Sequence, residues 1–599
     1  MKIERFAGLA AALVGFGVYL STLAPGVTFW DSGELICGAV GLGIPHPPGY
    51  PVFCMLGKAF YYLPFGNAAY RMNLLSASFA TATAYMLYRL VLEMLDGWAY
   101  GWALAASAAL CFCFYPSFWG VSVITEVYTL NTLVLCLVVL CLYRYDITRR
   151  LQYLYMSSFL LALSLVVHQS TVFFLPAYVM YFLLTDGNYK RPAVLASALF
   201  FFMLAFSVTL YLPIRATTDL LINIGDPDYL GGMIWSSKIE EHLWTLEHLP
   251  RKFSRLVGMY GVGTVALGFA ACAVMAYMFR KRGFVLMVLF AALSYFIGML
   301  ALTESSEIQK WGLQSKFYIP VVLMGVIAAA GLTAMIPSKS VRKSGAVACA
   351  LALTLIVSAG GLAYKYYHNV DHTRDYFAQD FATNTLKAVK DGGALFGWGD
   401  NGVFPVWYLQ RVEKYRDDVF FMHTELLSYP WYTAELQKRL YNRFGVVYLP
   451  SYPTKQYVRN IPVLRRILED RTPTYFDFSA LGTLKLPLND MTPQGLIFIT
   501  SAWPSDPLKR VWERYVVRGA LNTYDVNRQF AAEGILDIYR WQAWVATKYF
   551  YSINRYDDGF WAFNFARALG FDNPEAEREV EQVRHDLASR KAPAQIRSK

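Results

Sequence analysis

The stretch Phe29-Trp30-Asp31-Ser32-Gly33-Glu34 follows the first apolar segment of the chain, and Ile44-Pro45-His46-Pro47-Pro48-Gly49-Tyr50-Pro51 comes shortly after it. Asp31 and Glu34 stand three residues apart, so they share one face if the backbone is helical there. Carboxylates at the edge of a membrane are costly unless they are paired or used. We therefore interpret this stretch as a functional loop. The alternative is an acidic helix start, stabilised by the helix dipole.

The composition indicates a membrane protein joined to a water-soluble domain. Of the 599 residues, 56% are hydrophobic and only 16% are charged, which is too apolar for an ordinary soluble enzyme. Apolar runs long enough to span a bilayer recur up to about residue 367, and the chain from His368 onward is typical of a soluble α/β protein. The formal charge of +11 is not a nucleic-acid signal, because no basic stripe interleaved with aromatic residues is present.

About eleven transmembrane helices are predicted. They lie near residues 5–23, 70–93, 98–116, 128–145, 151–167, 170–184, 193–213, 256–279, 283–302, 317–336 and 344–364. Basic residues gather in alternate connections, and the positive-inside rule makes that side cytoplasmic. The Asp31 loop and the whole carboxy-terminal domain are then expected to face outward.

Three parts are expected: a transmembrane domain over 1–366, an α/β domain over 367–530 and a helical segment over 531–599 that resembles a tetratricopeptide unit. An apolar run ending in Gly397-Trp398-Gly399-Asp400-Asn401 predicts a buried strand that delivers polar residues to its carboxyl end, where α/β sites gather. Val419–Met422 and Gly495–Ile499 are further strand candidates.

The cysteines and glycosylation signals bear on the compartment. All eight cysteines lie at or before Cys349, none has zinc-site spacing, and the chain has no Asn-x-Ser/Thr sequon. An external domain without disulfides or glycan acceptors favours a bacterial inner membrane. We predict no metal site and no certain cofactor. A divalent cation is possible but not required.

Further polar candidates interrupt the apolar segments. Glu126 lies among apolar neighbours and must be paired, hydrated or ligating; the alternative is a structural hydrogen bond to Tyr128 or Asn131. His168 interrupts the apolar run 151–184 at a tight turn, where a lone histidine is more often structural than a metal ligand. Arg215 and Lys316 stand at outer ends of spans.

Each of the last candidates also has a simpler interpretation. Arg215 and Lys316 could clamp a phosphate, or they could snorkel to lipid headgroups. Asp226, in Gly225-Asp226-Pro227, is most simply a turn residue, and Gly399-Asp400-Asn401-Gly402 is a turn by itself. P-loop, dinucleotide and HExxH motifs are absent.

Taken together, these motifs resemble a family of GT-C-type membrane glycosyltransferases that includes the animal protein O-mannosyltransferase acting on plexin-type receptor domains. The first-loop signature is Phe29–Glu34 with Gly43–Pro51. The stretches Glu126–Asn131, Tyr211–Arg215 and Asn223–Pro227 are similar to later motifs of the family, and Gly399–Gln410 is similar to a stretch typical of its bacterial members. The resemblance extends to about Tyr432.

The resemblance implies a lipid-linked sugar donor, an outward-facing acceptor hydroxyl and a catalytic base at Asp31, with Glu34 and Glu126 in support. It makes Arg215, Lys316 and His168 candidates for binding the donor phosphate, although Lys316 stands where many GT-C enzymes have arginine. Candidate substrate-binding residues within these motifs are Trp30, His46, Tyr128, Asn131, Asp226, Asp400 and Asn401.

We accordingly predict a polytopic α-helical GT-C-type membrane protein with an extracytoplasmic α/β domain ending in tetratricopeptide-like helices. Its predicted activity is inverting transfer of a monosaccharide, mannose favoured, from a polyprenyl-phosphate donor to a Ser/Thr hydroxyl of an extracytoplasmic protein. The alternatives are a lipid or glycan acceptor, a transporter or flippase of lipid-linked sugars, and a non-catalytic binding protein. Transporters tend to show internal repeats, and no second copy of the Asp31 motif is present.

Overall fold

The chain divides into two compact units. The first comprises Met1–Val27 and Glu34–Arg374, and the second comprises Thr28–Gly33 and Asp375–Lys599. The computed structural model describes residues 2–185, 187–218, 220–224, 283–302, 316, 318–428, 430–446, 460–484, 491–500, 508–518 and 530–596. The six residues Thr28–Gly33 therefore belong with a unit whose other residues begin almost 350 positions later.

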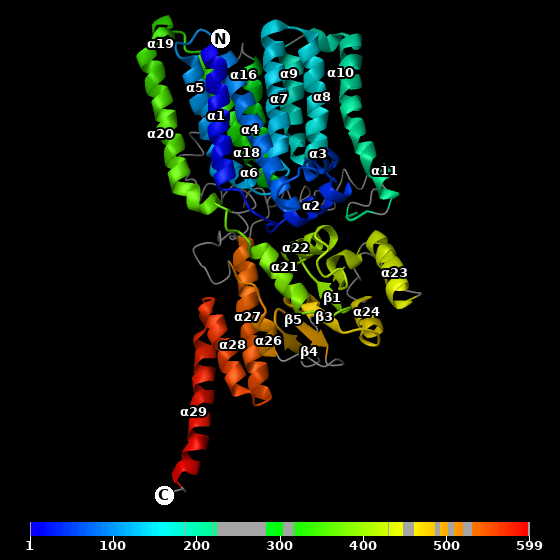
Figure 1. Ribbon diagram of the computed structural model, residues 1–599. Helices are drawn as coiled ribbons and strands as arrows, with labels where there is room; N and C mark the ends of the chain where they lie inside the picture. The colour runs from blue at the N-terminus through cyan, green and yellow to red at the C-terminus, as the bar shows by residue number, and fades with distance from the viewer. Residues whose placement is uncertain are drawn as a thin grey trace. The chain divides into compact units, whose positions relative to one another are not determined.

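The first unit is built from helices (Figure 1). Its longer helices are α1 (Lys2–Ser21), α4 (Ala68–Met94), α5 (Gly101–Cys113), α7 (Tyr128–Thr148), α8 (Leu151–Val167), α9 (Leu175–Thr185), α10 (Pro192–Phe206), α16 (Gly283–Leu302), α18 (Ile319–Ala334) and α20 (Gly345–Val370). Its shorter ones are α2 (Ser32–Gly41), α3 (Pro51–Tyr61), α6 (Pro116–Ser122), α11 (Tyr211–Ala216) and α19 (Lys339–Lys343). Every predicted span within the described residues is helical, and the predicted span 256–279 lies outside them.

The protein is a multi-pass membrane protein. Among the described helices, α1, α7, α20 and the continuous stretch Pro192–Ala216 are long and apolar enough to cross a membrane. A fifth span results if α5 and α6 count as one, because this pair is bent by 70° at a short break where Pro116 opens α6 and disfavours a helical residue before it. Four shorter apolar helices accompany them. The number of eleven spans stays a prediction.

Helix α4 is central to the first unit, since it packs against α1, α5, α7 and α18. Its buried small residues Ala77, Ala80 and Ala84 let neighbouring backbones approach closely, as in other membrane helix bundles. Within α4 the buried Asn73 donates to the carbonyl oxygens of Ala24 and Gly26, at 2.9 and 3.0 Å. The connection that follows α1 is thus fixed against the bundle.

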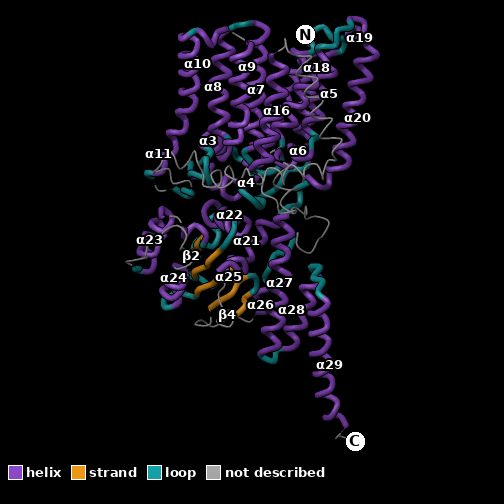
Figure 2. Tube along the Cα trace, turned by 180° about the vertical axis from the view of Figure 1, so that it is seen from behind, coloured by secondary structure: helices purple, strands orange, loops and turns teal. Residues whose placement is uncertain are grey.

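The two ends of the helix bundle differ in charge. At one end the Ala99 N–H donates to the Arg342 carbonyl oxygen in α19, at 2.9 Å, and Arg144 pairs with Glu93 at 2.6 Å. The short helices α2, α3 and α6 lie at the end of the bundle opposite α19 (Figure 1), and Figure 2 shows α3 and α6 there as well. The basic connections within the described residues are therefore found at the end away from α2, and the one at residues 280–282 lies outside them.

The second unit contains a five-stranded sheet in the order β2-β1-β3-β5-β4. The strands are β1 (Ala394–Gly397), β2 (Phe420–His423), β3 (Thr474–Asp477), β4 (Met491–Gln494) and β5 (Ile497–Thr500). Strand β1 pairs in parallel with β2 and β3, and β5 runs antiparallel to β3 and β4. The carboxyl ends of β1, β2 and β3 thus meet at one edge, as expected for an α/β protein. The three predicted strands are confirmed, whereas β3 and β4 were not predicted.

Helices surround this small sheet and extend the second unit (Figure 1). They are α21 (Phe377–Lys387), α22 (Asp400–Trp407), α23 (Pro430–Phe444), α24 (Asn460–Glu469), α25 (Phe478–Leu484), α26 (Leu508–Glu513), α27 (Phe530–Ser552), α28 (Tyr556–Ala568) and α29 (Pro574–Ile596). The last three make the segment after residue 530 helical, and Ala546, Phe550 and Ala562 form a core between α27 and α28. Its likeness to a tetratricopeptide unit stays a prediction.

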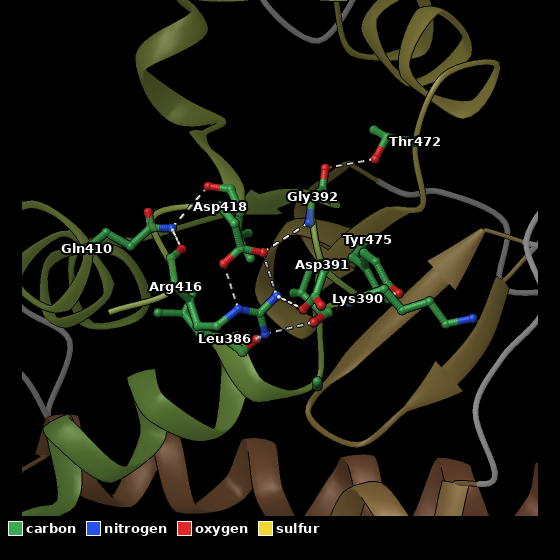
Figure 3. A network of polar contacts seen from close by, with 12 residues as sticks. Leu386, Lys390, Asp391, Gly392, Gln410, Arg416, Asp418, Thr472 and Tyr475 are labelled. Carbon is green, nitrogen blue, oxygen red and sulfur yellow. Dashed lines mark hydrogen bonds and ion pairs between the residues drawn. The ribbon is translucent and has the colours of Figure 1, made fainter. Parts of the chain in front are cut away.

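A polar network joins the starts of β1 and β2 (Figure 3). The Arg416 guanidinium contacts the Asp418 carboxylate at 2.7 and 2.9 Å and donates to the carbonyl oxygens of Leu386 and Val389, both at 2.9 Å. The Asp418 carboxylate also accepts a hydrogen bond from the Gly392 N–H, at 3.0 Å. Because these groups precede the two strands, the network aligns the strands whose far ends carry the polar residues described next.

Candidate functional site

Residues Thr28–Gly33, which include the start of the first-loop signature, belong to the second unit. The Trp30 N–H donates to the side-chain oxygen of Asn401 at 2.8 Å, and the ring of Phe29 meets the ring of Phe377 edge to face at 5.6 Å between centroids. A Cβ on Gly33 would lie 2.2 Å from the Phe404 carbonyl oxygen, so only glycine permits this approach. The two most specific motifs of the sequence, Phe29–Glu34 and Gly399–Gln410, are therefore in direct contact.

Asp31 lies in a turn immediately before α2. Its backbone neighbour Trp30 has a positive φ of 62°, which turns the chain sharply between the residue held by Asn401 and the carboxylate. Asp31 is half-buried. Within the described part of the chain its carboxylate has no hydrogen bond or ion pair, so it can accept a proton from an incoming group.

Glu34, one helical turn further, is engaged differently. It is fully buried and accepts a hydrogen bond from the His46 backbone N–H, while its Oε2 lies 2.7 Å from His46 Nδ1. The other ring nitrogen of His46, Nε2, lies 2.8 Å from the Tyr50 hydroxyl. The two carboxylates of the first stretch thus differ in their contacts. Asp31 is available to a substrate, whereas Glu34 holds the proline-rich turn.

Two further motifs converge on the proline-rich segment within the first unit. Ile44 forms a parallel β-bridge with Asn223, and the Tyr211 hydroxyl donates to the Gly43 carbonyl oxygen at 3.0 Å. A Cβ on Gly43 would lie 2.7 Å from the Ile222 carbonyl oxygen, which explains the glycine. The motifs Tyr211–Arg215 and Asn223–Pro227 therefore support the signature directly, and Asp226 lies outside the described residues.

Arg215 caps the end of α2. Its Nε and Nη2 donate to the carbonyl oxygens of Leu42 and Gly41, at 2.8 and 3.2 Å, where a cation also complements the negative end of the helix dipole. A guanidinium has five N–H donors, so these two contacts leave others for an anion. Arg215 is positioned by the same segment that it helps to hold.

Four predicted residues form a second polar cluster, in the first unit. Lys316 Nζ lies 2.5 Å from Glu126 Oε1, and both side chains are buried, at 8% and 1% exposure. The same ammonium lies 5.3 Å from the centre of the Tyr128 ring, which contacts the His168 ring at 5.0 Å. Glu126 therefore pairs with Lys316, a charged partner that was not considered for it from the sequence.

Asn131 and His168 have local structural partners. The Asn131 side-chain oxygen accepts hydrogen bonds from Ser164 and Thr171, at 2.9 and 3.1 Å. His168 ends α8 in an extended conformation, and its Nδ1 lies 2.7 Å from the Ser170 hydroxyl. The break predicted at His168 is thus present. These contacts hold the turn between α8 and the following 3-10 helix, Gln169–Phe174.

The carboxyl edge of the sheet in the second unit gathers polar groups that follow β1, β2 and β3. Asp477, at the end of β3, accepts hydrogen bonds from the N–H groups of Trp398 and Ala480, at 2.9 and 2.6 Å, and burial raises its pKa to about 7. His423 ends β2 against the rings of Phe404 and Trp407, and burial lowers its pKa to about 3.

His423 and Asp477 were not among the residues predicted from the sequence. The signal that could have found them is their position: a polar residue directly after a short apolar strand lies at the edge where α/β sites form. That rule selected Asp400 and Asn401 after β1. It applies equally to the residue after the predicted strand Val419–Met422, which is His423.

Comparison with known proteins shows what this fold and these motifs are similar to. The fold matches a solved structure described as "Crystal Structure of ArnT from Cupriavidus metallidurans bound to Undecaprenyl phosphate", with a TM-score of 0.52 and 13% identity, covering 83% of this chain and 98% of that one. Two separate stretches of the chain also match family models. The "Protein O-mannosyl-transferase TMEM260 N-terminal domain" model matches residues 31–191, and the "TMEM260-associated domain 2" model matches residues 378–461.

Two curated relatives carry the same name. The Mus musculus protein O-mannosyl-transferase TMEM260 is 27% identical over 472 residues, which cover 73% of this chain and 64% of the relative. The Dictyostelium discoideum protein O-mannosyl-transferase tmem260 is 22% identical over 496 residues, covering 73% and 59%. The matched region spans less than two thirds of each relative. Asp31, Glu34, His46 and Glu126 lie in the first family match, and Asp400 and Asn401 lie in the second.

Proposed function

We propose that this protein is an inverting glycosyltransferase that moves a monosaccharide, mannose favoured, from a polyprenyl-phosphate donor to a Ser or Thr hydroxyl of an extracytoplasmic protein. The observation that carries the proposal is the state of Asp31. It is the one carboxylate of the signature without a described partner, directly after a residue held by Asn401. The matches to proteins named O-mannosyl-transferases, and to a GT-C structure with undecaprenyl phosphate, support the substrate classes.

In the proposed reaction the acceptor hydroxyl attacks the anomeric carbon while Asp31 accepts its proton. The bond between the anomeric carbon and the phosphate oxygen breaks, and the polyprenyl phosphate leaves with the electron pair. Because that phosphate departs as a charged group, the step needs a base and a nearby cation but no general acid. Direct displacement inverts the configuration at the anomeric carbon.

A cation beside the signature segment is Arg215, whose guanidinium is held at the end of α2 with N–H groups beyond those given to Gly41 and Leu42. We assign it to the donor phosphate. Lys316 is buried against Glu126, and removing one partner of a buried pair is costly. We therefore propose that this pair shapes the part of the first unit that binds the donor, with Tyr128 and His168 beside it.

For Glu34, we propose a positioning role in place of the direct catalytic one. Its two contacts with His46 fix the turn between α2 and α3, so Glu34 orients the segment that Asp31 precedes. The absence of cysteines after Cys349 and the basic residues at the α19 end of the bundle support an extracytoplasmic second unit in a bacterial inner membrane.

The test is sugar transfer by the purified full chain in nanodiscs. Radiolabelled polyprenyl-phosphate sugars, mannose first, are offered with extracytoplasmic proteins as acceptors, and wild type is compared with Asp31→Asn. Label is expected to reach protein with wild type, and the variant is expected to lose about 10²- to 10⁴-fold in rate, the usual contribution of a positioned base. If label reaches only lipid or glycan, the acceptor is a lipid or glycan and not a protein. Equal transfer by both proteins would remove Asp31 from the reaction, and no transfer by folded wild type would favour a transporter.

A further inference from the structure

The carboxyl edge of the sheet in the second unit brings three metal-ligating side chains together. Asp400 follows β1, while His423 and Glu425 end and follow β2. One carboxylate oxygen of Asp400, one of Glu425 and a ring nitrogen of His423 all lie within 4.8 Å of one another. The parallel register that pairs Gly397 with His423 produces this grouping, because both strands end at the same level.

The histidine separates this group from an ordinary acidic surface cluster. His423 is only 2% exposed, and within the described residues its buried Nδ1 has no hydrogen-bond partner. Leaving a buried polar atom unsatisfied costs about 1–3 kcal/mol, so such atoms usually have a reason to be there. A bound cation would satisfy a ring nitrogen that lies within 4.8 Å of two carboxylate oxygens.

From this geometry we infer a divalent transition-metal site formed by Asp400, His423 and Glu425, with Zn²⁺ as the favoured ion. One imidazole nitrogen with two carboxylate oxygens is a ligand set that suits zinc and its neighbours in the first transition row. Mg²⁺ and Ca²⁺ prefer oxygen ligands alone. Three protein ligands leave a coordination position for water. The buried histidine is rigidly placed against aromatic rings, while the two exposed carboxylates can close on the ion.

A metal ion at this site would also fix the backbone of the loop that contains Trp30 and Asp31. Asp400 is followed by Asn401, whose side-chain oxygen accepts the Trp30 N–H. Both residues lie in the first turn of α22, after Gly399 with its φ of 75°. An ion bound to Asp400 would fix this turn and, through Asn401, the backbone next to Asp31. This consequence rests on the proposed function, whereas the metal site itself does not.

The test is metal binding by the purified full chain. Wild type, the double variant Asp400→Asn/Glu425→Gln and the control Asp417→Asn, an exposed carboxylate outside the cluster, are stripped with a chelator, incubated with Zn²⁺ and analysed for bound zinc. Wild type and control are expected to hold one more equivalent than the double variant. The zinc affinity of the double variant at this site should fall at least about tenfold, since even the loss of an outer-shell partner lowers metal affinity 10- to 100-fold.

Equal zinc binding by wild type and the double variant would overturn the inference, and so would a wild type that binds none. If the double variant unfolds, Glu425→Gln alone replaces it, because that side chain is exposed. A second measurement is thermal unfolding with and without Zn²⁺, since a ligand that binds the folded state raises its stability. The rise is expected for wild type and control only. These measurements need no transfer activity, so their result stands apart from the fate of the proposed transferase reaction.

Discussion

The side-chain oxygen of Asn401 accepts a hydrogen bond from the Trp30 N–H, one residue before the proposed base. Asn401 touches no reacting atom in this arrangement, so we assign it a positioning role. The sequence motif had suggested that it binds substrate. The positioning role and the substrate-binding role predict different effects of a conservative replacement of Asn401. Holding the Trp30 N–H requires only an acceptor oxygen, which a conservative replacement can keep.

Asn401→Ala is therefore expected to lower kcat with little change in the KM for the donor, and to destabilise the second unit by about 1 kcal/mol, the net contribution of one hydrogen bond. Asn401→Asp keeps an acceptor oxygen and is expected to retain most of the activity. Steady-state transfer and thermal unfolding of both variants measure this. If Asn401→Asp loses as much kcat as Asn401→Ala, the acceptor role for Trp30 is insufficient and a substrate contact is favoured.

Glu34→Gln provides a contrast to the change at Asp31. Glutamine keeps an acceptor for the His46 backbone N–H but loses the charge that faces His46 Nδ1. We expect reduced thermal stability and a partial loss of activity for Glu34→Gln, against a loss of activity at unchanged stability for Asp31→Asn. Unfolding midpoints and transfer rates of the two variants separate these outcomes. A Glu34→Gln enzyme as stable as wild type but inactive would restore Glu34 to a direct catalytic role.

At the scale of elements, the Arg416–Asp418 network determines how β1 and β2 start (Figure 3). The hydrogen bonds from Arg416 lower the pKa of Asp418 to about 2, below the value of 3.8 of an unperturbed carboxyl. A carboxyl with a depressed pKa in the folded state contributes stability above its unfolded pKa and loses it as the pH falls toward the folded value. The contribution is therefore lost between about pH 4 and pH 2, and it is modest because Asp418 is partly exposed.

The prediction is that the second unit of wild type loses thermal stability more steeply than Asp418→Asn as the pH falls from about 5 toward 2. The variant should start lower and change less, because its amide does not titrate. Asp417→Asn, which changes a neighbouring exposed carboxyl, serves as the control and should follow wild type. Parallel pH profiles for wild type and Asp418→Asn would show that the network contributes nothing to the acid sensitivity.

The elements show why the helices could be predicted and part of the sheet could not. Long apolar runs have one stable form in a membrane, and the predicted span 151–167 coincides with α8. All five strands have four residues each, but β3 begins and ends with the polar residues Thr474 and Asp477 and β4 contains Pro493, so neither is a continuous apolar run and their strand character depends on their partners. Short strands of this kind have no distinct local pattern.

The same reasoning applies to the site. The types of residue could be chosen from motifs, but their partners could not. Asn401 lies 371 residues from Trp30, and Lys316 lies 190 residues from Glu126. No local spacing connects such pairs, and the pairing changes the role of each residue. Lys316 was expected at a phosphate and is found against Glu126, while Arg215 retains N–H groups for that task.

At the scale of the whole molecule, the proposed reaction requires that the second unit and the Asp31 loop share the outer side of the membrane. The loop residues Thr28–Gly33 are part of the second unit, so the two must lie on the same side whichever side that is. The direction rests on charge: Lys339, Arg342 and Lys343 in α19 belong to the basic connections, which the positive-inside rule places in the cytoplasm.

We therefore predict that a cysteine introduced at Asp417, in the second unit, reacts with a membrane-impermeant thiol reagent in intact cells. A cysteine at Ser340 in α19 should react only after the membrane is opened. Both side chains are exposed, so reactivity reports the side of the membrane and not burial. The unmodified chain is the background control, because its own cysteines all lie in the first unit.

Labelling in the reverse pattern would place Asp31 on the cytoplasmic side. The acceptor would then have to be a cytoplasmic protein or lipid, and the substrate assignment would fall while the GT-C fold remained. Labelling of both positions in intact cells would mean that the reagent crosses the membrane or that the orientation is mixed. A cysteine at Ser589, exposed in α29 of the second unit, tests whether this unit lies wholly on one side, because its labelling must then match that of Asp417→Cys.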